Sequence, residues 1–97
     1  MVVKYKVVWT LEAKSQVDNI IFYLRKEWSE SEVKDFLDIL YHFEQTISAF
    51  PKSFKVSKKF KGCRLGFVHR HITGIYRISG KTITILTIID NRSRHKK

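Results

Sequence analysis

The chain has 97 residues, of which 19 are Lys or Arg and 9 are Asp or Glu, so its formal net charge is +10. This length predicts one domain over residues 1–97, and an apolar share of 43% supplies a core, which excludes a disordered chain. Cys63, the single cysteine, excludes an internal disulfide, and no apolar run approaches the roughly 18 residues of a membrane span, so we expect a cytoplasmic protein that binds no membrane.

Positive charge is concentrated in the second half of the chain. Residues 1–50 carry six basic and eight acidic side chains, whereas residues 51–97 carry thirteen basic side chains and one acid, Asp90. Such an excess of one sign destabilises a compact chain by self-repulsion, which a polyanionic partner relieves. The sequence therefore predicts a polyanionic partner, either a nucleic acid or an acidic protein.

The first half predicts a strand followed by two helices. Residues 2–9 are rich in β-branched and aromatic side chains, which favours a strand. Thr10 can cap a helix over residues 11–27, where apolar residues recur at helical spacing. Ser29 and Glu32 fit a capping box for a second helix, which must end near residue 49, before Pro51. Five aromatic side chains at core-compatible positions are expected to be buried: Trp9, Trp28, Phe36, Phe43 and Tyr76.

The second half predicts a loop and three strands. Residues 51–63 have the composition of an irregular basic loop. Residues 64–68, 71–79 and 82–89 favour strands, and Ser79-Gly80-Lys81 is typical of a turn between the last two. The predicted fold is therefore α+β: a strand, a helical hairpin and then a three-stranded antiparallel sheet, with the hairpin on one face of the sheet.

Several kinds of active site are disfavoured by residues that the sequence lacks. Its four glycines do not have the spacing of a phosphate-binding loop. Cys63 stands alone, and His69 and His71 have no third metal ligand nearby in the sequence. A two-metal nuclease needs several convergent carboxylates, whereas the basic half has one. We therefore expect no metal and no other cofactor.

The candidate site consists of basic residues in the second half. Metal-free cleavage of RNA needs a base, an acid, and cations that stabilise the phosphorane. Arginine supplies the charge, histidine suits acid or base chemistry near neutral pH, and a lysine among other cations is a further candidate base. The predicted catalytic residues are Lys58, Lys61, Arg64, Arg92 and His95. The predicted nucleic-acid-binding residues are Lys52, Lys55, Lys59, His69, Arg70, His71, Arg94 and Lys96.

An ordered set of residues along nearly the whole chain carries a family resemblance. In the first half the set consists of Trp9, Ala13, Ile20-Ile21, Tyr23-Leu24, Trp28-Ser29, Phe36, Leu40, Ile47 and Pro51. In the second half it consists of Arg64, His71, Ile75-Tyr76-Arg77, Ile83, Ile85-Leu86, Ile88-Ile89-Asp90 and Arg92. Together these residues resemble the RelE/ParE toxins of bacterial type II toxin–antitoxin modules. The resemblance implies the same order of elements, and a cognate antitoxin whose acidic C-terminal segment wraps the toxin and masks its basic surface.

The resemblance implies one of two activities. RelE-like members enter the ribosomal A site and cleave mRNA with basic residues and a C-terminal Tyr or His, whereas ParE-like members poison DNA gyrase. Arg64 and Arg92 match arginines of the family, and His95 lies a few positions after the family's C-terminal acid or stacking residue. The lysines of residues 51–63 resemble the lysine-rich loop of the RelE branch.

The sequence also departs from the RelE-like pattern. No tyrosine follows Tyr76, residues 51–63 contain no carboxylate, and residues 62–77 resemble the ParE branch. The basic second half and His95 nevertheless favour a metal-free, ribosome-dependent mRNA endonuclease, and these departures keep a gyrase poison that has no catalysis of its own as the alternative. A third reading is an inactive or purely DNA-binding relative.

Overall fold

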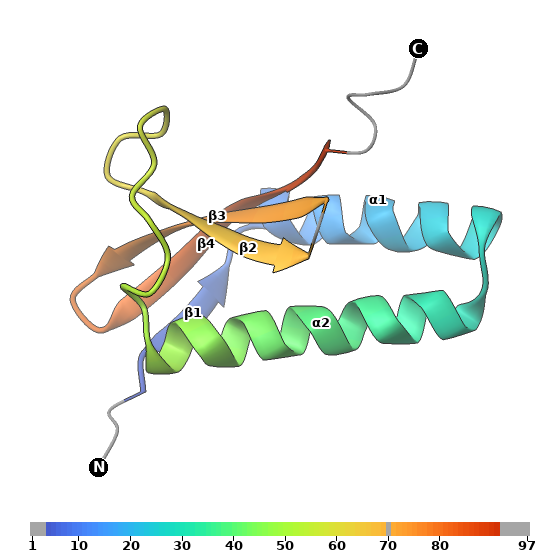
Figure 1. The fold of residues 1–97 in the computed structure, drawn as a ribbon, viewed down its shortest axis with the longest axis horizontal. Coiled ribbons are helices and arrows are strands. Elements are labelled where there is room, and N and C mark those ends of the chain that lie inside the picture. Colours follow the sequence, from blue (N-terminus) through green and yellow to red (C-terminus); the bar gives the residue numbers. More distant parts are fainter. Residues whose placement is uncertain (1–3, 70, 92–97) are drawn as a thin grey trace.

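The computed structural model describes residues 4–69 and 71–91, which form a four-stranded sheet and two helices (Figure 1). In chain order the elements are β1 (Lys6–Trp9), α1 (Leu11–Glu27), α2 (Glu30–Ala49), β2 (Arg64–His69), β3 (Ile72–Ser79) and β4 (Thr82–Asp90). The predicted order of elements is confirmed, and each predicted boundary of the helices and of the last three strands lies within one residue of the observed one. The first strand is shorter than predicted: it begins at Lys6, and Lys4 and Tyr5 lie before it.

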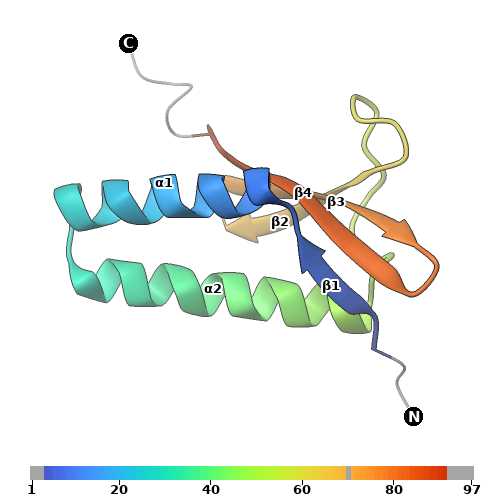
Figure 2. The ribbon, with the colours of Figure 1, turned by 180° about the vertical axis from the view of Figure 1, so that it is seen from behind.

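The sheet is mixed, with the strand order β1-β4-β3-β2. Its antiparallel part consists of β2, β3 and β4, as predicted. β1 pairs parallel with β4, from Lys6 opposite Thr82 to Trp9 opposite Ile85, and Figure 2 shows the two strands side by side. The alternating pattern of residues 2–9 indicates a strand but not its partner, so this fourth strand of the sheet could not be placed from the sequence.

The two helices begin in different ways. The Oγ1 atom of Thr10 accepts a hydrogen bond from the Ala13 amide at 3.0 Å, so the predicted cap of α1 is confirmed. Ser29 has the extended backbone of a cap, but its side chain makes no capping hydrogen bond, so the predicted capping box is wrong. The Glu32 side chain instead lines a pocket that His69 also lines.

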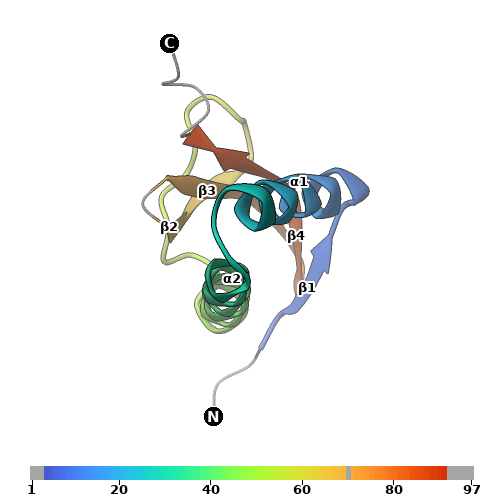
Figure 3. The same ribbon diagram turned by 90° about the vertical axis from the view of Figure 1, so that its right-hand side faces the viewer.

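One hydrophobic cluster joins both helices to the sheet. α1 lies against β4, while α2 approaches β2 and β1 (Figures 1 and 3). Phe36, Phe43 and Tyr76 are buried as predicted, and Trp9 packs against the edge of the cluster. Trp28 is 62% exposed, which corrects the prediction that it is buried. Because α1 ends at Glu27, Trp28 lies beyond the last turn and leaves the apolar stripe of the helix.

Phe43 of α2 lies directly on the sheet at two glycines. A Cβ atom added to Gly66 of β2 would lie 2.4 Å from Phe43 Cε1, and one added to Gly74 of β3 would lie 3.0 Å from the same ring. The absence of side chains at these paired positions lets the ring reach the strands. Phe43 is thereby placed against Tyr76 and Phe54, the latter in the segment between α2 and β2.

Candidate nucleic-acid interface

The segment between α2 and β2, residues 51–63, is called the lysine loop below. It contains five lysines and no acidic residue: Lys52, Lys55, Lys58, Lys59 and Lys61. All five side chains are exposed. The loop extends past the sheet on the side away from α2 (Figures 1 and 3), so its lysines form a projecting cationic surface.

Two side chains of the sheet hold the first part of the lysine loop. The Tyr76 hydroxyl of β3 donates a hydrogen bond to the Pro51 carbonyl at 2.6 Å. The Arg64 guanidinium, at the start of β2, donates from Nη1 to the Phe54 carbonyl at 2.7 Å. Arg64 and Tyr76 are paired across the two strands, so both bonds arise at one place in the sheet.

The rest of the lysine loop is closed by backbone hydrogen bonds. The Leu65 amide donates to the Lys55 carbonyl at 3.0 Å, and the Ser57 amide donates to the Cys63 carbonyl at 2.8 Å. The buried Ser57 hydroxyl accepts from the amides of Lys59 and Phe60. The loop was predicted to be irregular, and it contains no helix or strand, but these bonds define its path.

The helices and the lysine loop differ in charge balance. Both ion pairs among the described residues lie on the helical hairpin: Arg25 with Glu30 at 2.7 Å and Lys34 with Asp38 at 3.9 Å. The hairpin therefore offsets part of its own charge, although such exposed pairs contribute little stability. The lysine loop contains no carboxylate that could do the same, so its positive potential faces outward.

Burial affects the protonation of the Tyr76 phenol. Burial raises the pKa of the Tyr76 phenol above its usual 10.0, and the positive charge of Arg64 opposes this shift. The phenol therefore stays protonated at neutral pH and can donate its hydrogen bond to Pro51. This donor lies inside the protein, with no exposed surface on Tyr76.

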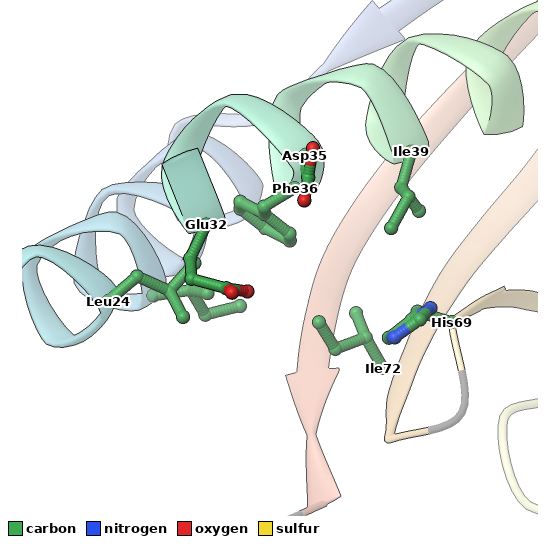
Figure 4. A pocket seen from close by; sticks show the side chains of 8 residues that line it. Leu24, Glu32, Asp35, Phe36, Ile39, His69 and Ile72 are labelled. Carbon is green, nitrogen blue, oxygen red and sulfur yellow. The ribbon is translucent and has the colours of Figure 1, made fainter. Parts of the chain in front are cut away.

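The predicted histidines lie at the other end of β2 and β3. His69 is five residues after Arg64 on β2, which corresponds to about 17 Å at the usual rise of a strand. It lines a pocket of about 210 Å³ with Glu32 and Asp35 of α2 (Figure 4). His71 is exposed, and its carbonyl accepts a hydrogen bond from the Asn91 amide at 2.7 Å.

The structure therefore groups the predicted site residues in part. Arg64 lies with the lysine loop, while His69 and His71 lie at the opposite end of the β2–β3 pair. Five other predicted residues lie outside the described part of the chain: Arg70, Arg92, Arg94, His95 and Lys96. Their roles stay predictions.

Sequence reasoning did not select two exposed basic residues near the lysine loop. Arg77 follows Tyr76 on β3, one position from the pair that Tyr76 makes with Arg64. Lys81 lies in the turn between β3 and β4, at the same end of the sheet. Strand alternation could have identified Arg77, because the neighbour of an inward-facing tyrosine points outward.

Within residues 4–69 and 71–91, no group of three His, Cys, Asp or Glu side chains is placed to hold a metal ion. In the same part of the chain, neither helix combines the length and the apolar character needed to cross a membrane.

No family model matches the sequence. No curated protein matches it either. Solved structures do resemble the fold. A chain of the chromosomal ParDE toxin–antitoxin system from P. aeruginosa matches with a TM-score of 0.73 and 22% identity, over 90% of this chain and 96% of that one.

Two further matches come from toxin–antitoxin complexes. A chain of the RelBE2 complex from Mycobacterium tuberculosis has a TM-score of 0.65 and 18% identity, over 91% of this chain and 92% of that one. A chain of the E. coli DinJ-YafQ complex has a TM-score of 0.62 and 9% identity, over 96% and 99% of the two chains. The matches to ParE, RelE and YafQ toxins thus cover nearly the full chain, and we conclude that it has the RelE/ParE-like α+β fold.

Proposed function

We propose that this chain is the toxin of a type II toxin–antitoxin module and acts in the cytoplasm as a metal-free, ribosome-dependent mRNA endonuclease. The observation that carries the proposal is the lysine loop. It presents five exposed cations and no acid, on a fold shared with chains of toxin–antitoxin systems. A fixed array of cations suits binding of a phosphate backbone and stabilisation of charge that develops during phosphodiester cleavage.

In this proposal the basic residues divide the work. Lys52, Lys55 and Lys59 contact phosphates, and Lys58 or Lys61 removes the proton from the 2′-hydroxyl. Arg64 and Arg92 stabilise the phosphorane, and His95 protonates the leaving 5′-oxygen. Arg77, which is exposed on β3, adds a further phosphate contact in this proposal.

The proposed partner before activation is a cognate antitoxin with an acidic segment. The lysine loop supplies the complementary charge, and an apolar groove beside it supplies a binding surface. This groove is a pocket of about 310 Å³ along α2, which Phe54 of the lysine loop also lines. It is bordered by Phe67, which is 64% exposed on the edge strand β2. An antitoxin segment that covers Phe67 and reaches the lysine loop would block both surfaces.

A gyrase poison is the second candidate function. The specific observation in its favour is the structural match to the ParDE chain, whose TM-score of 0.73 exceeds the 0.65 of the RelBE2 chain. In this alternative the lysine loop docks on gyrase or on its DNA and performs no chemistry.

A pulse of expression followed by mapping of new mRNA 5′ ends separates the two functions. The nuclease predicts new ends inside translated codons, which disappear when a drug blocks ribosomes. Growth arrest with DNA damage and unchanged mRNA ends would favour the gyrase alternative. The matched control is the Lys58→Ala/Lys61→Ala variant, which should abolish the new ends without unfolding the protein, because both side chains are exposed.

A further inference from the structure

The beginning of the lysine loop is held to the sheet by a small number of polar contacts. Two side chains of the sheet donate hydrogen bonds to it: the Tyr76 hydroxyl to the Pro51 carbonyl, and the Arg64 guanidinium to the Phe54 carbonyl. Phe54 also packs against the rings of Phe43 and Tyr76, with centroids 5.9 and 6.5 Å away. The beginning of the loop is thus fixed to the core at two carbonyls and one ring.

Tyr76 is fully buried, so no ligand on the surface can touch it. Its hydroxyl can influence a bound polyanion only through the loop segment that it holds. Arg64 is half-buried, and Nη1 of its guanidinium is directed at the Phe54 carbonyl. One nitrogen of the guanidinium therefore donates to the loop. The geometry thus gives Arg64 a role in holding the loop, in addition to any contact with phosphate.

We propose that Arg64 and Tyr76 are positioning residues, whose hydrogen bonds to the Phe54 and Pro51 carbonyls hold the lysine loop in the one conformation that binds a nucleic-acid backbone. The proposal rests on the nucleic-acid-binding role proposed above. A loop that is ordered before binding loses less conformational entropy when it binds, so its lysines gain affinity without any added charge.

Tyr76→Phe is the decisive variant, because it removes one hydroxyl and keeps the ring that packs against Phe43 and Phe54. Its matched control is Ser48→Ala. The Ser48 hydroxyl also donates to a backbone carbonyl, that of Tyr5 at 2.7 Å, but this bond ties α2 to the segment before β1. Both variants lose one buried hydroxyl bond, and only Tyr76→Phe loses a bond to the lysine loop.

Hydrogen exchange measures whether the loop loosens. We expect the amides of Ser57, Cys63 and Leu65, which close the loop, to exchange roughly five- to tenfold faster in Tyr76→Phe than in Ser48→Ala. Affinity for a short single-stranded RNA should fall by a similar factor in Tyr76→Phe alone. The salt dependence of binding should stay that of the wild type, because no charge has been removed.

Arg64→Lys tests the second residue with the charge retained. A lysine cannot reproduce the directed guanidinium bond to Phe54, so we expect the same faster exchange and weaker RNA binding. Full retention of binding in Arg64→Lys would show that charge alone matters at this position and would overturn the role of Arg64.

The outcomes for Tyr76 separate this inference from the proposed function. Faster loop exchange together with weaker RNA binding supports it. Unchanged exchange, or faster exchange with unchanged affinity, overturns it. If the wild-type protein itself binds no RNA, the nucleic-acid function fails and the affinity part of the inference fails with it, while the exchange rates still report whether Tyr76 holds the loop.

Discussion

The helical hairpin (residues 11–49) carries acidic and basic side chains together, whereas the lysine loop carries basic side chains alone. The hairpin is held by apolar burial along two stripes, which includes Ala13, Leu40 and Ile47. The loop packs one ring, that of Phe54, against the core, and hydrogen bonds at Pro51, Phe54 and Ser57 hold the rest of its path.

The two regions therefore differ in whether opposite charges lie within reach of one another. On the hairpin, residues such as Lys34 and Asp38 lie within reach of an opposite charge at the surface, as on any solvated helix. In the loop, five lysines lie within one segment that has no acidic residue, and hydrogen bonds to the sheet fix the beginning of that segment. Removing hairpin charges should therefore change little, while removing loop charges or loop bonds should change binding.

The largest expected effect comes from Phe43, where the two regions meet. Phe43→Ala should lower the free energy of unfolding by about 3–5 kcal/mol, because it removes a ring buried against Gly66, Phe54 and Tyr76. Urea unfolding followed by circular dichroism measures this. Leu37→Ala, on the same helix but 46% exposed, is the control and should cost much less. Equal losses in the two variants would contradict the placement of Phe43 on the sheet.

The next largest effect is expected from lysines of the lysine loop, compared with lysines of the helical hairpin. A triple variant, Lys58→Ala/Lys59→Ala/Lys61→Ala, should weaken single-stranded RNA binding roughly tenfold to a hundredfold near physiological salt, and reduce the salt slope by about 0.7 per lysine. The matched control removes three exposed hairpin lysines, Lys14, Lys26 and Lys34, and should leave both quantities unchanged. A similar loss in the control would mean that net charge, and not the loop, determines binding.

How far the sequence predicts this molecule depends on the range of the interactions involved. Both helices begin and end where predicted, because a cap at Thr10 and the break before Pro51 are local signals. Trp28 follows the predicted end of α1, and its exposure could not be predicted, because the helical spacing does not fix the direction of a side chain beyond the helix. The parallel partner of β1 lies more than seventy residues along the chain, beyond the reach of any local pattern.

The candidate site shows the same limit. The lysines of residues 51–63 and Arg64 could be selected from composition and resemblance, and the structure groups them. The fixing of the loop could not be predicted, because Tyr76 reaches Pro51 across 25 residues and looks in the sequence like an ordinary core tyrosine. The separation of the histidines from the lysines, in contrast, follows from the predicted strand, because β2 runs from the end of the lysine loop to His69.

A smaller effect compares two serines. Ser57→Ala in the loop should cost about 1 kcal/mol of unfolding free energy, because the Lys59 and Phe60 amides lose their acceptor. Ser29→Ala at the start of α2 should cost only a few tenths, because its hydroxyl makes no capping bond. Thermal or urea unfolding of both variants provides the measurement. A larger loss of unfolding free energy in Ser29→Ala than in Ser57→Ala would contradict the conclusion that the Ser57 hydroxyl holds the loop.

The smallest effect concerns pH and isolates the bond between Tyr76 and the loop. Because burial raises the pKa of Tyr76 above 10.0 in the folded state, the folded protein keeps this proton after the unfolded chain has lost it. The unfolded state then binds fewer protons, so the contribution of Tyr76 to stability is intact below about pH 9 and falls as the pH rises through 10. The stability difference between the wild type and Tyr76→Phe should therefore shrink from about pH 9 to about pH 11, whereas the difference between the wild type and Ser48→Ala should not, because serine does not titrate in this range. A difference that stays constant for Tyr76→Phe would mean that the phenol is solvated in the folded protein, and that the lysine loop is not anchored at Pro51.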